Sequence, residues 1–326
     1  MDIIINNNYE GKLIREVLKN DLGFSVSLIK KLKFSEDGIK VNGKWVTVRY
    51  CLQHGDVLSL ATEDKPDDVS PYIIPVDLPL GIVYEDEFVT AVNKPCNMPS
   101  HPSHGHRLDT VANALAHRYS DKTYVFRPVN RLDRDTSGCM LTANTKDASF
   151  KLYTSMVDGL ILKTYLAVLD GELPRDEGEI FSHVRRKEDS IIVREECSPD
   201  CPDAKPALSV YRKICSSCGK TLVLASPITG RTHQLRLHFA GLGCPVTGDS
   251  LYGSESEFIS RHALHSWNTV FPHPYTGENI SVTAPVPEDI AALMEQYGLS
   301  LPDDPSVTDI TALISACKNR KDLLQQ

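Results

Sequence analysis

The chain has little of what marks membrane and secreted proteins. Its longest apolar runs fall far short of the ~18 residues that a bilayer-spanning helix needs. The first residues, MDIIINNNYEGK, lack the basic start and apolar core of a secretory signal. Nine cysteines is an odd number, and their spacing forms no compact disulfide framework. We therefore expect a cytoplasmic protein with reduced thiols and no membrane partner.

Positive charge is also in short supply. The 35 Lys and Arg residues are outnumbered by 43 Asp and Glu, and the net charge of −8 argues against a generally basic nucleic-acid binder. The basic residues are unevenly spread, however, because residues 12–49 contain nine Lys or Arg against four Asp or Glu. The next segment, TEDKPDDVSPY, is acidic, contains two prolines and has few core-forming residues, as is typical of a linker.

These shifts in composition suggest two domains, which is what a length of 326 residues allows. The predicted order is a small basic domain, a linker, a large domain and a helical tail, over residues 1–62, 63–72, 73–300 and 301–326. The tail, TDITALISACKNRKDLLQQ, is expected to begin with Thr308 or Ser306 as its N-cap.

The small domain is predicted to contain two short helices and a hairpin. Apolar positions at helical spacing predict helices over 13–22 and 27–34. Asn42-Gly43 stands between two short strands and is a residue pair that a type I′ turn favours. This order of elements resembles the S4 RNA-binding domain over roughly residues 10–60.

Lysines on the second predicted helix are the candidate RNA contacts of this domain. Lys30, Lys31 and Lys33 can bind phosphates, or they can form an ordinary solvated face. Composition alone favours neither interpretation, and the S4 resemblance favours phosphate binding.

The tripeptide Arg-Leu-Asp occurs twice in the large domain. Asp109 stands just before a predicted helix over 110–119, where capping the helix accounts for it fully. Asp133 stands in RPVNRLDRDTSGCMLTANT, an irregular loop that enters a strand and carries three arginines. The arginines would hold Asp133 ionised in a site, although a surface ion-pair cluster is the alternative.

Two later segments favour a functional site around Asp133 over a surface ion-pair cluster. KTYLAVLDGEL, at 163–173, predicts a strand with Tyr165 and Ala167 on one face. In SPITGRTHQLRLHFAGLG we predict a helix from about residue 231 that ends at Gly241 or Gly243 and puts Thr232 and Arg236 on one face. The alternative interpretation is an ordinary surface helix, but the concentration of Arg, His and Gln in this segment is high for one.

The order NRLDRDTSG, KTYLAV, GRTHQLRLH resembles the three signature motifs of the RluA-type pseudouridine synthases, over roughly residues 78–290. The resemblance implies an α+β fold with a mixed, mostly antiparallel sheet around a catalytic cleft. It implies isomerisation of uridine to pseudouridine in RNA, with ribosomal RNA of the large subunit as the first candidate and tRNA as the second. That reaction requires no metal or cofactor, and we expect a monomer.

The resemblance also implies roles for individual residues. Asp133 would be the nucleophile or base, Arg236 its ion-pair partner, and Tyr165 would stack on uracil and serve in the deprotonation at C5. Arg131 would steady the flipped nucleotide, while Lys163 and Arg231 position phosphates. Asn130 stands where the family usually has His, which we expect to affect support of the loop.

Two alternatives stay open at this point. A non-catalytic RNA-binding or ribosome-assembly factor could have the same fold, although the presence of Asp133, Tyr165 and Arg236 favours activity. A structural zinc ion could be held by four thiolates, or these could be bystander thiols: Cys197, Cys201, Cys215 and Cys218.

Overall fold

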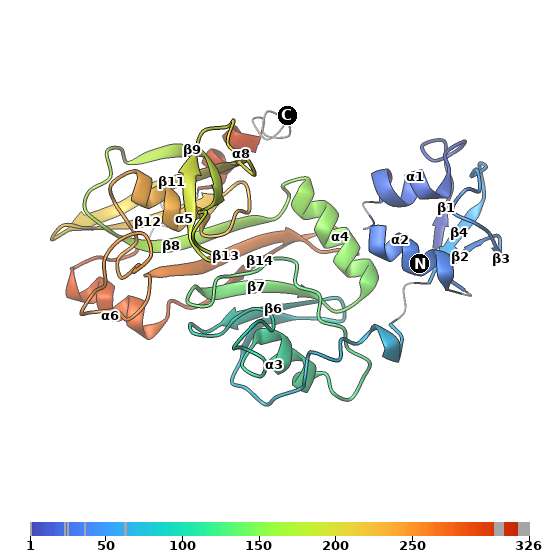
Figure 1. The fold of residues 1–326 in the computed structure, drawn as a ribbon, viewed down its shortest axis with the longest axis horizontal. Helices are drawn as coiled ribbons and strands as arrows, with labels where there is room; N and C mark the ends of the chain where they lie inside the picture. Colours follow the sequence, from blue (N-terminus) through green and yellow to red (C-terminus); the bar gives the residue numbers. More distant parts are fainter. Residues whose placement is uncertain are drawn as a thin grey trace.

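The computed structural model describes residues 2–22, 24, 26–35, 37–61, 64–302 and 310–318, without the side chains of Ser27 and Leu28 (Figure 1). Within these residues, no helix is both long and apolar enough to cross a membrane. The helical elements are α1 (Ile14–Glu16), a π-helical turn (Val17–Asp21), α2 (Val26–Phe34), a 3₁₀ turn (Pro66–Asp68), α3 (Val111–Arg118), α4 (Lys146–Val157), α5 (Gln234–Gly241), α6 (Glu288–Gln296) and α8 (Thr311–Lys318).

The strands form two sheets. A four-stranded sheet has the order β1-β4-β2-β3, and a ten-stranded sheet has the order β10-β9-β11-β12-β8-β13-β7-β6-β5, with β14 paired to β13. The bounds are β1 (Asp2–Ile4), β2 (Ile39–Val41), β3 (Lys44–Trp45), β4 (Val57–Leu60), β5 (Gly81–Glu85), β6 (Val89–Lys94), β7 (Ser137–Ala143), β8 (Leu162–Asp170), β9 (Glu177–Arg186), β10 (Arg194–Cys197), β11 (Lys205–Ser217), β12 (Lys220–Pro227), β13 (Leu264–Pro272) and β14 (Asn279–Thr283).

The N-terminal part has a hydrophobic cluster of its own, in which Ile14, Leu18 and Leu58 are fully buried. Asn42 and Gly43 both have positive φ, which confirms the predicted hairpin turn. The helix predicted over 13–22 changes pitch instead of staying α-helical. The amide of Leu22 bonds the carbonyl of Val17 at 2.8 Å, five residues back, and this wider turn lets both side chains face the same cluster.

Two aspartates in the predicted linker form ion pairs with the rest of the chain. Asp68 pairs with Lys31 of α2 and, at 2.6 Å, with Lys146 at the start of α4. Asp64 pairs with Arg127. The side chains of Asp68 and Asp64 are only 5% and 12% exposed, whereas residues 65–67 between them are exposed. Composition predicted the connection but not these contacts.

The large sheet confirms the predicted α+β class and its mostly antiparallel character. Among the pairings of the described residues, only β13 with β7 is parallel, over His265 to Ser137 and Ser266 to Gly138. Gly138 has a φ of +108°, and a Cβ there would lie 2.2 Å from the carbonyl oxygen of Ser266. The close approach of the two strands therefore requires glycine at this point.

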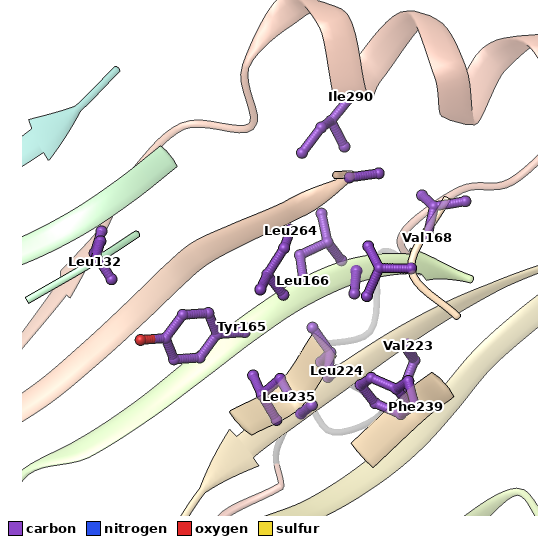
Figure 2. Packing of buried hydrophobic residues seen from close by; sticks show 14 of the residues in the cluster. Leu132, Tyr165, Leu166, Val168, Val223, Leu224, Leu235, Phe239, Leu264 and Ile290 are labelled. Atoms are coloured by element: carbon purple, nitrogen blue, oxygen red, sulfur yellow. The ribbon is translucent and has the colours of Figure 1, made fainter. Parts of the chain in front are cut away.

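Alternation along β7 gives the sheet two covered faces. Cys139 and Leu141 face a cluster that includes Leu152 of α4, and Met140 faces the main cluster, which includes Leu115 of α3. Figure 2 shows the main cluster, which extends across β8, β12 and α5. Figure 1 shows α3 and α4 on either side of β6 and β7.

Two predicted helix starts are wrong. Thr110, not Asp109, is the N-cap of α3, because Thr110 has the extended backbone that this position needs and its Oγ1 accepts from the amide of Asn113 at 3.3 Å. Helix α5 begins at Gln234, because His233 is left-handed with a φ of 58°. Thr232 therefore precedes the helix and does not share a helical face with Arg236. The helix ends at Gly241, one of the two predicted stops.

The tail includes α8, whose Ile314 and Cys317 pack into the main cluster. The predicted caps Thr308 and Ser306 lie outside the described residues.

The four cysteines of the candidate zinc site do not come together. Cys197 on β10 lies opposite His183 of β9, which in turn lies opposite Pro206 of β11. Cys215 is about nine residues further along β11, or roughly 30 Å at the rise of a strand. Among the described residues, no three His, Cys, Asp or Glu side chains form a group that could hold a metal ion. The four thiols, all within the described part of the chain, therefore form no common zinc site, because Cys197 and Cys201 lie at and after the end of β10 while Cys215 and Cys218 lie at the far end of β11.

Candidate active site

A cleft of about 960 Å³ lies where the Asp133 loop, β8 and the start of α5 meet. All six residues that the sequence predicted for the large domain line it: Asp133, Tyr165, Arg236, Arg131, Lys163 and Arg231. The N-terminal lysines, Lys30, Lys31 and Lys33, lie on α2 with exposed side chains and are not part of its lining.

The Asp133 loop is anchored through the residues that precede the aspartate. Leu132 is 7% exposed, and its backbone amide and carbonyl both bond the hydroxyl of Ser100, at 3.2 and 2.9 Å. The side-chain carbonyl of Asn130 accepts from the amide of Leu141 on β7 at 2.8 Å. The side chain of Asn130 therefore supports the loop, while the carboxylate of Asp133 stays 28% exposed at the cleft.

Arg236 has a stronger partner than the one predicted. Its guanidinium makes two bonds of 2.6 Å to Asp249, whose side chain is fully buried, and its Nη1 lies 3.6 Å from Oδ2 of Asp133. Burial raises the pKa of Asp249, but the bonds from Arg236 outweigh it and leave the pKa below its usual value. Asp249 thus neutralises Arg236 and fixes it in a forked geometry beside Asp133.

Sequence reasoning missed Asp249. The signal available in the sequence was a single acidic residue in VTGDSLYG, a segment with no other charged residue.

Tyr165 on β8 combines a buried ring with a place in the cleft lining. Figure 2 shows its ring at the edge of the main cluster, with the hydroxyl pointing away from Val223 and Phe239. Burial raises the pKa of this phenol well above its usual value. The hydroxyl is therefore neutral at pH 7. It can orient a nucleobase by hydrogen bonding, but it is a weak proton acceptor.

Lys94 is a second residue that the sequence did not single out. It is fully buried at the end of β6, and its Nζ donates to the carbonyls of Pro95, Met98 and Arg134 at 2.8 Å each. Burial lowers the pKa of Lys94 to about 7. Because one of its acceptors, the carbonyl of Arg134, directly follows Asp133, Lys94 ties the Asp133 loop to the sheet. A lysine that ends the apolar strand FVTAVNK was the available signal.

Comparison with known proteins agrees with this geometry. The family model for RNA pseudouridylate synthase matches residues 89–241, the span that contains Asp133, Tyr165 and Arg236. The RNA pseudouridine synthase YjbO of Bacillus subtilis is 37% identical over 277 residues, which cover 84% of this chain and 96% of that protein. The chain belongs to the RNA pseudouridine synthase family.

Further relatives extend the match. The ribosomal large subunit pseudouridine synthase D of Vibrio parahaemolyticus is 32% identical over 290 residues, covering 82% of this chain and 86% of that protein. The solved structure of human RNA Pseudouridylate Synthase Domain Containing 1 superimposes with a TM-score of 0.54 at 26% identity, covering 69% of this chain and 97% of the human chain.

This pseudouridine synthase is thus an enzyme that isomerises uridine in RNA. A uridine inside a stack cannot present its sugar and base to a carboxylate, so the nucleotide must be extruded into the cleft. Polar groups from three distant segments surround the space where the nucleotide would sit.

Proposed function

We propose that this enzyme converts specific uridines of large-subunit ribosomal RNA to pseudouridine, with Asp133 as the essential carboxylate. The observation that carries the proposal is the convergence of Asp133, Tyr165 and Arg236 on one cleft from segments that are up to a hundred residues apart. Relatives named as large-subunit pseudouridine synthases favour ribosomal RNA over tRNA.

The chemistry explains why a single carboxylate is enough. The N1–C1′ bond breaks, uracil turns over, C5 bonds C1′, and the proton on C5 is lost while N1 gains one. Asp133 either adds to C1′ and is released when C5 bonds that carbon, or removes a proton from C2′ and later returns it, and both routes need an ionised oxygen that faces the ribose. Nη1 of Arg236 lies 3.6 Å from Oδ2 of Asp133 and would help to hold this carboxylate at the ribose.

The other cleft residues would bind the RNA. Arg131 is exposed at the cleft and would steady the flipped nucleotide. Lys163 and Arg231 would contact phosphates, and Arg231 is already oriented by a 2.9 Å bond from its Nε to the carbonyl of Pro206. Tyr165 would stack on uracil with a neutral hydroxyl.

The N-terminal part, over 1–62, would act as an S4-type module that sets affinity. Its lysines would bind phosphates of the same RNA, and the enzyme would work as a cytoplasmic monomer. Replacing Lys30 and Lys33 with Gln should weaken RNA binding and reduce its salt dependence by roughly one counterion per lysine, with turnover of saturating substrate unchanged.

Tritium release from RNA labelled at uracil C5 tests the activity, since a non-catalytic RNA-binding factor would release none. Mapping pseudouridines in RNA from cells with and without the protein tests the substrate. We expect the lost sites to fall in large-subunit ribosomal RNA, and losses confined to tRNA would contradict that assignment.

A further inference from the structure

His233 stands in a backbone conformation that few side chains adopt. Its φ of 58° and ψ of 17° lie in the left-handed region, directly before α5. Residues other than glycine persist there only where their surroundings hold them, and such positions concentrate at functional sites. His233 also lines the cleft, with a side chain that is only 9% exposed.

The imidazole of His233 is oriented by Tyr252. The hydroxyl of Tyr252 accepts from the backbone amide of Arg194 at 2.8 Å and lies 2.9 Å from Nδ1 of His233. Because that amide can only donate, the single hydroxyl proton is available for Nδ1. A neutral imidazole then carries its own proton on Nε2.

Burial and two neighbouring arginines favour the neutral form of His233 over the pull of two carboxylates. Burial lowers the pKa of His233, Asp133 opposes this, and Arg236 and Arg194 add to it, with Asp249 a further opposing charge. The imidazole is therefore neutral at pH 7.

The proton on Nε2 faces the catalytic carboxylate. Nε2 lies 3.8 Å from Oδ2 of Asp133, and Nη1 of Arg236 lies 3.6 Å from the same oxygen. Within the part of the chain that the structure describes, no hydrogen bond reaches Oδ1 of Asp133, and the shortest contacts of His233 and Arg236 with this carboxylate are both to Oδ2. Both distances exceed a hydrogen bond, as is common in catalytic sites without substrate, where such contacts shorten in the complex.

We infer that His233 is a positioning residue which, oriented by Tyr252, binds Oδ2 of Asp133 and leaves Oδ1 directed at the ribose of the flipped uridine. This inference rests on the proposed role of Asp133. It assigns His233 no contact with the reacting atoms, only control over which carboxylate oxygen meets them.

The sharpest variant is His233→Gly, because glycine adopts a φ near 58° without strain while the imidazole is lost. Thermal stability should be kept or raised. We expect kcat for tritium release to fall about 10- to 100-fold, the size expected when a reacting group is misplaced by about 1 Å. KM should stay within about twofold, since a residue that acts by orienting Asp133 contributes little to phosphate binding.

Two further variants distinguish the loss of the hydrogen-bond donor of His233 from the loss of its side-chain volume. His233→Gln keeps a donor near the place of Nε2 and should recover kcat at least about fivefold over His233→Gly. Tyr252→Phe should lower kcat on its own, yet add little in combination with His233→Gly, because both act through the same imidazole.

The outcomes distinguish the inference from the proposed function. The inference is overturned if His233→Gly has the kcat of the wild type, or if the losses of the two single variants multiply in the double variant. In that case an inactive Asp133→Asn would leave the proposed function standing. An active Asp133→Asn would overturn both. If His233→Gly unfolds at the assay temperature, Tyr252→Phe decides instead: a lower kcat at constant KM supports the inference, and an unchanged kcat contradicts it.

Discussion

The two Arg-Leu-Asp segments, 107–109 and 131–133, have the same three residues and opposite environments. Leu108 is 50% exposed, whereas Leu132 is 7% exposed and bonded twice to Ser100. Asp109 meets His106, three residues before it, at 2.5 Å. Asp133 meets His233 and Arg236, about a hundred residues away in sequence. A buried leucine thus distinguishes an aspartate held at a cleft from one paired with its own neighbour.

The largest effect should come from Asp133→Asn. The amide keeps the shape of the side chain but can neither add to carbon nor accept a proton usefully, so we expect tritium release to fall by at least about a thousandfold. RNA binding, measured by filter retention, should stay largely intact because phosphate contacts carry most of the affinity.

Asp249→Asn should be the most damaging change to the fold around this site. It leaves Arg236 buried without its counter-charge, and breaking such a pair costs about 3–5 kcal/mol in the free energy of unfolding. Urea denaturation measures this, with Asp109→Asn as the matched control. A loss below about 1 kcal/mol would mean that Asp133 or water replaces the missing partner.

The same pair makes stability depend on pH. The folded pKa of Asp249 lies below its usual 3.8, so its contribution is complete above about pH 5 and is lost as the pH falls through the folded pKa. Melting temperatures between pH 6 and pH 3 should therefore decline less steeply in Asp249→Asn than in the wild type. Parallel declines would show that other carboxylates dominate the acid limb.

Truncating the two leucines tests the anchor directly. Leu132→Ala should cost about 2–4 kcal/mol of stability, since it empties a buried site, and Leu108→Ala at most about 0.5 kcal/mol. Turnover should fall in the Leu132 variant below the temperature at which it unfolds, because the loop that carries Asp133 loosens. Equal effects of the two truncations would contradict the comparison.

The smallest effect belongs to Asp109→Asn. The capping residue of α3 is Thr110, and the pair of Asp109 with His106 is partly exposed, with side chains 49% and 30% accessible. We expect turnover within about twofold of wild type and a stability change within about 0.5 kcal/mol. An inactive Asp109 variant beside an active Asp133 variant would reverse the assignment of the catalytic copy.

Local patterns were enough for much of this molecule. Alternation and turn residues predicted the Asn42-Gly43 hairpin and strands such as β7 and β8, because these signals act between residues a few positions apart. The motif context of Asp133, with Thr-Ser-Gly behind it, distinguished it from Asp109. Local patterns misplaced the starts of α3 and α5, because the signals for a helix end do not fix its first residue to within one or two positions.

The sequence by itself determined the fold class, the family and six residues that line one cleft. Only the tertiary structure decided which charges meet. Asp249 bonds Arg236, Tyr252 orients His233, and Asp64 and Asp68 bind basic residues on both sides of the predicted linker, while the two pairs of cysteines lie far from each other. The reason is physical: secondary structure follows from neighbours along the chain, whereas an ion pair between distant segments depends on where the packing of the whole sheet places them.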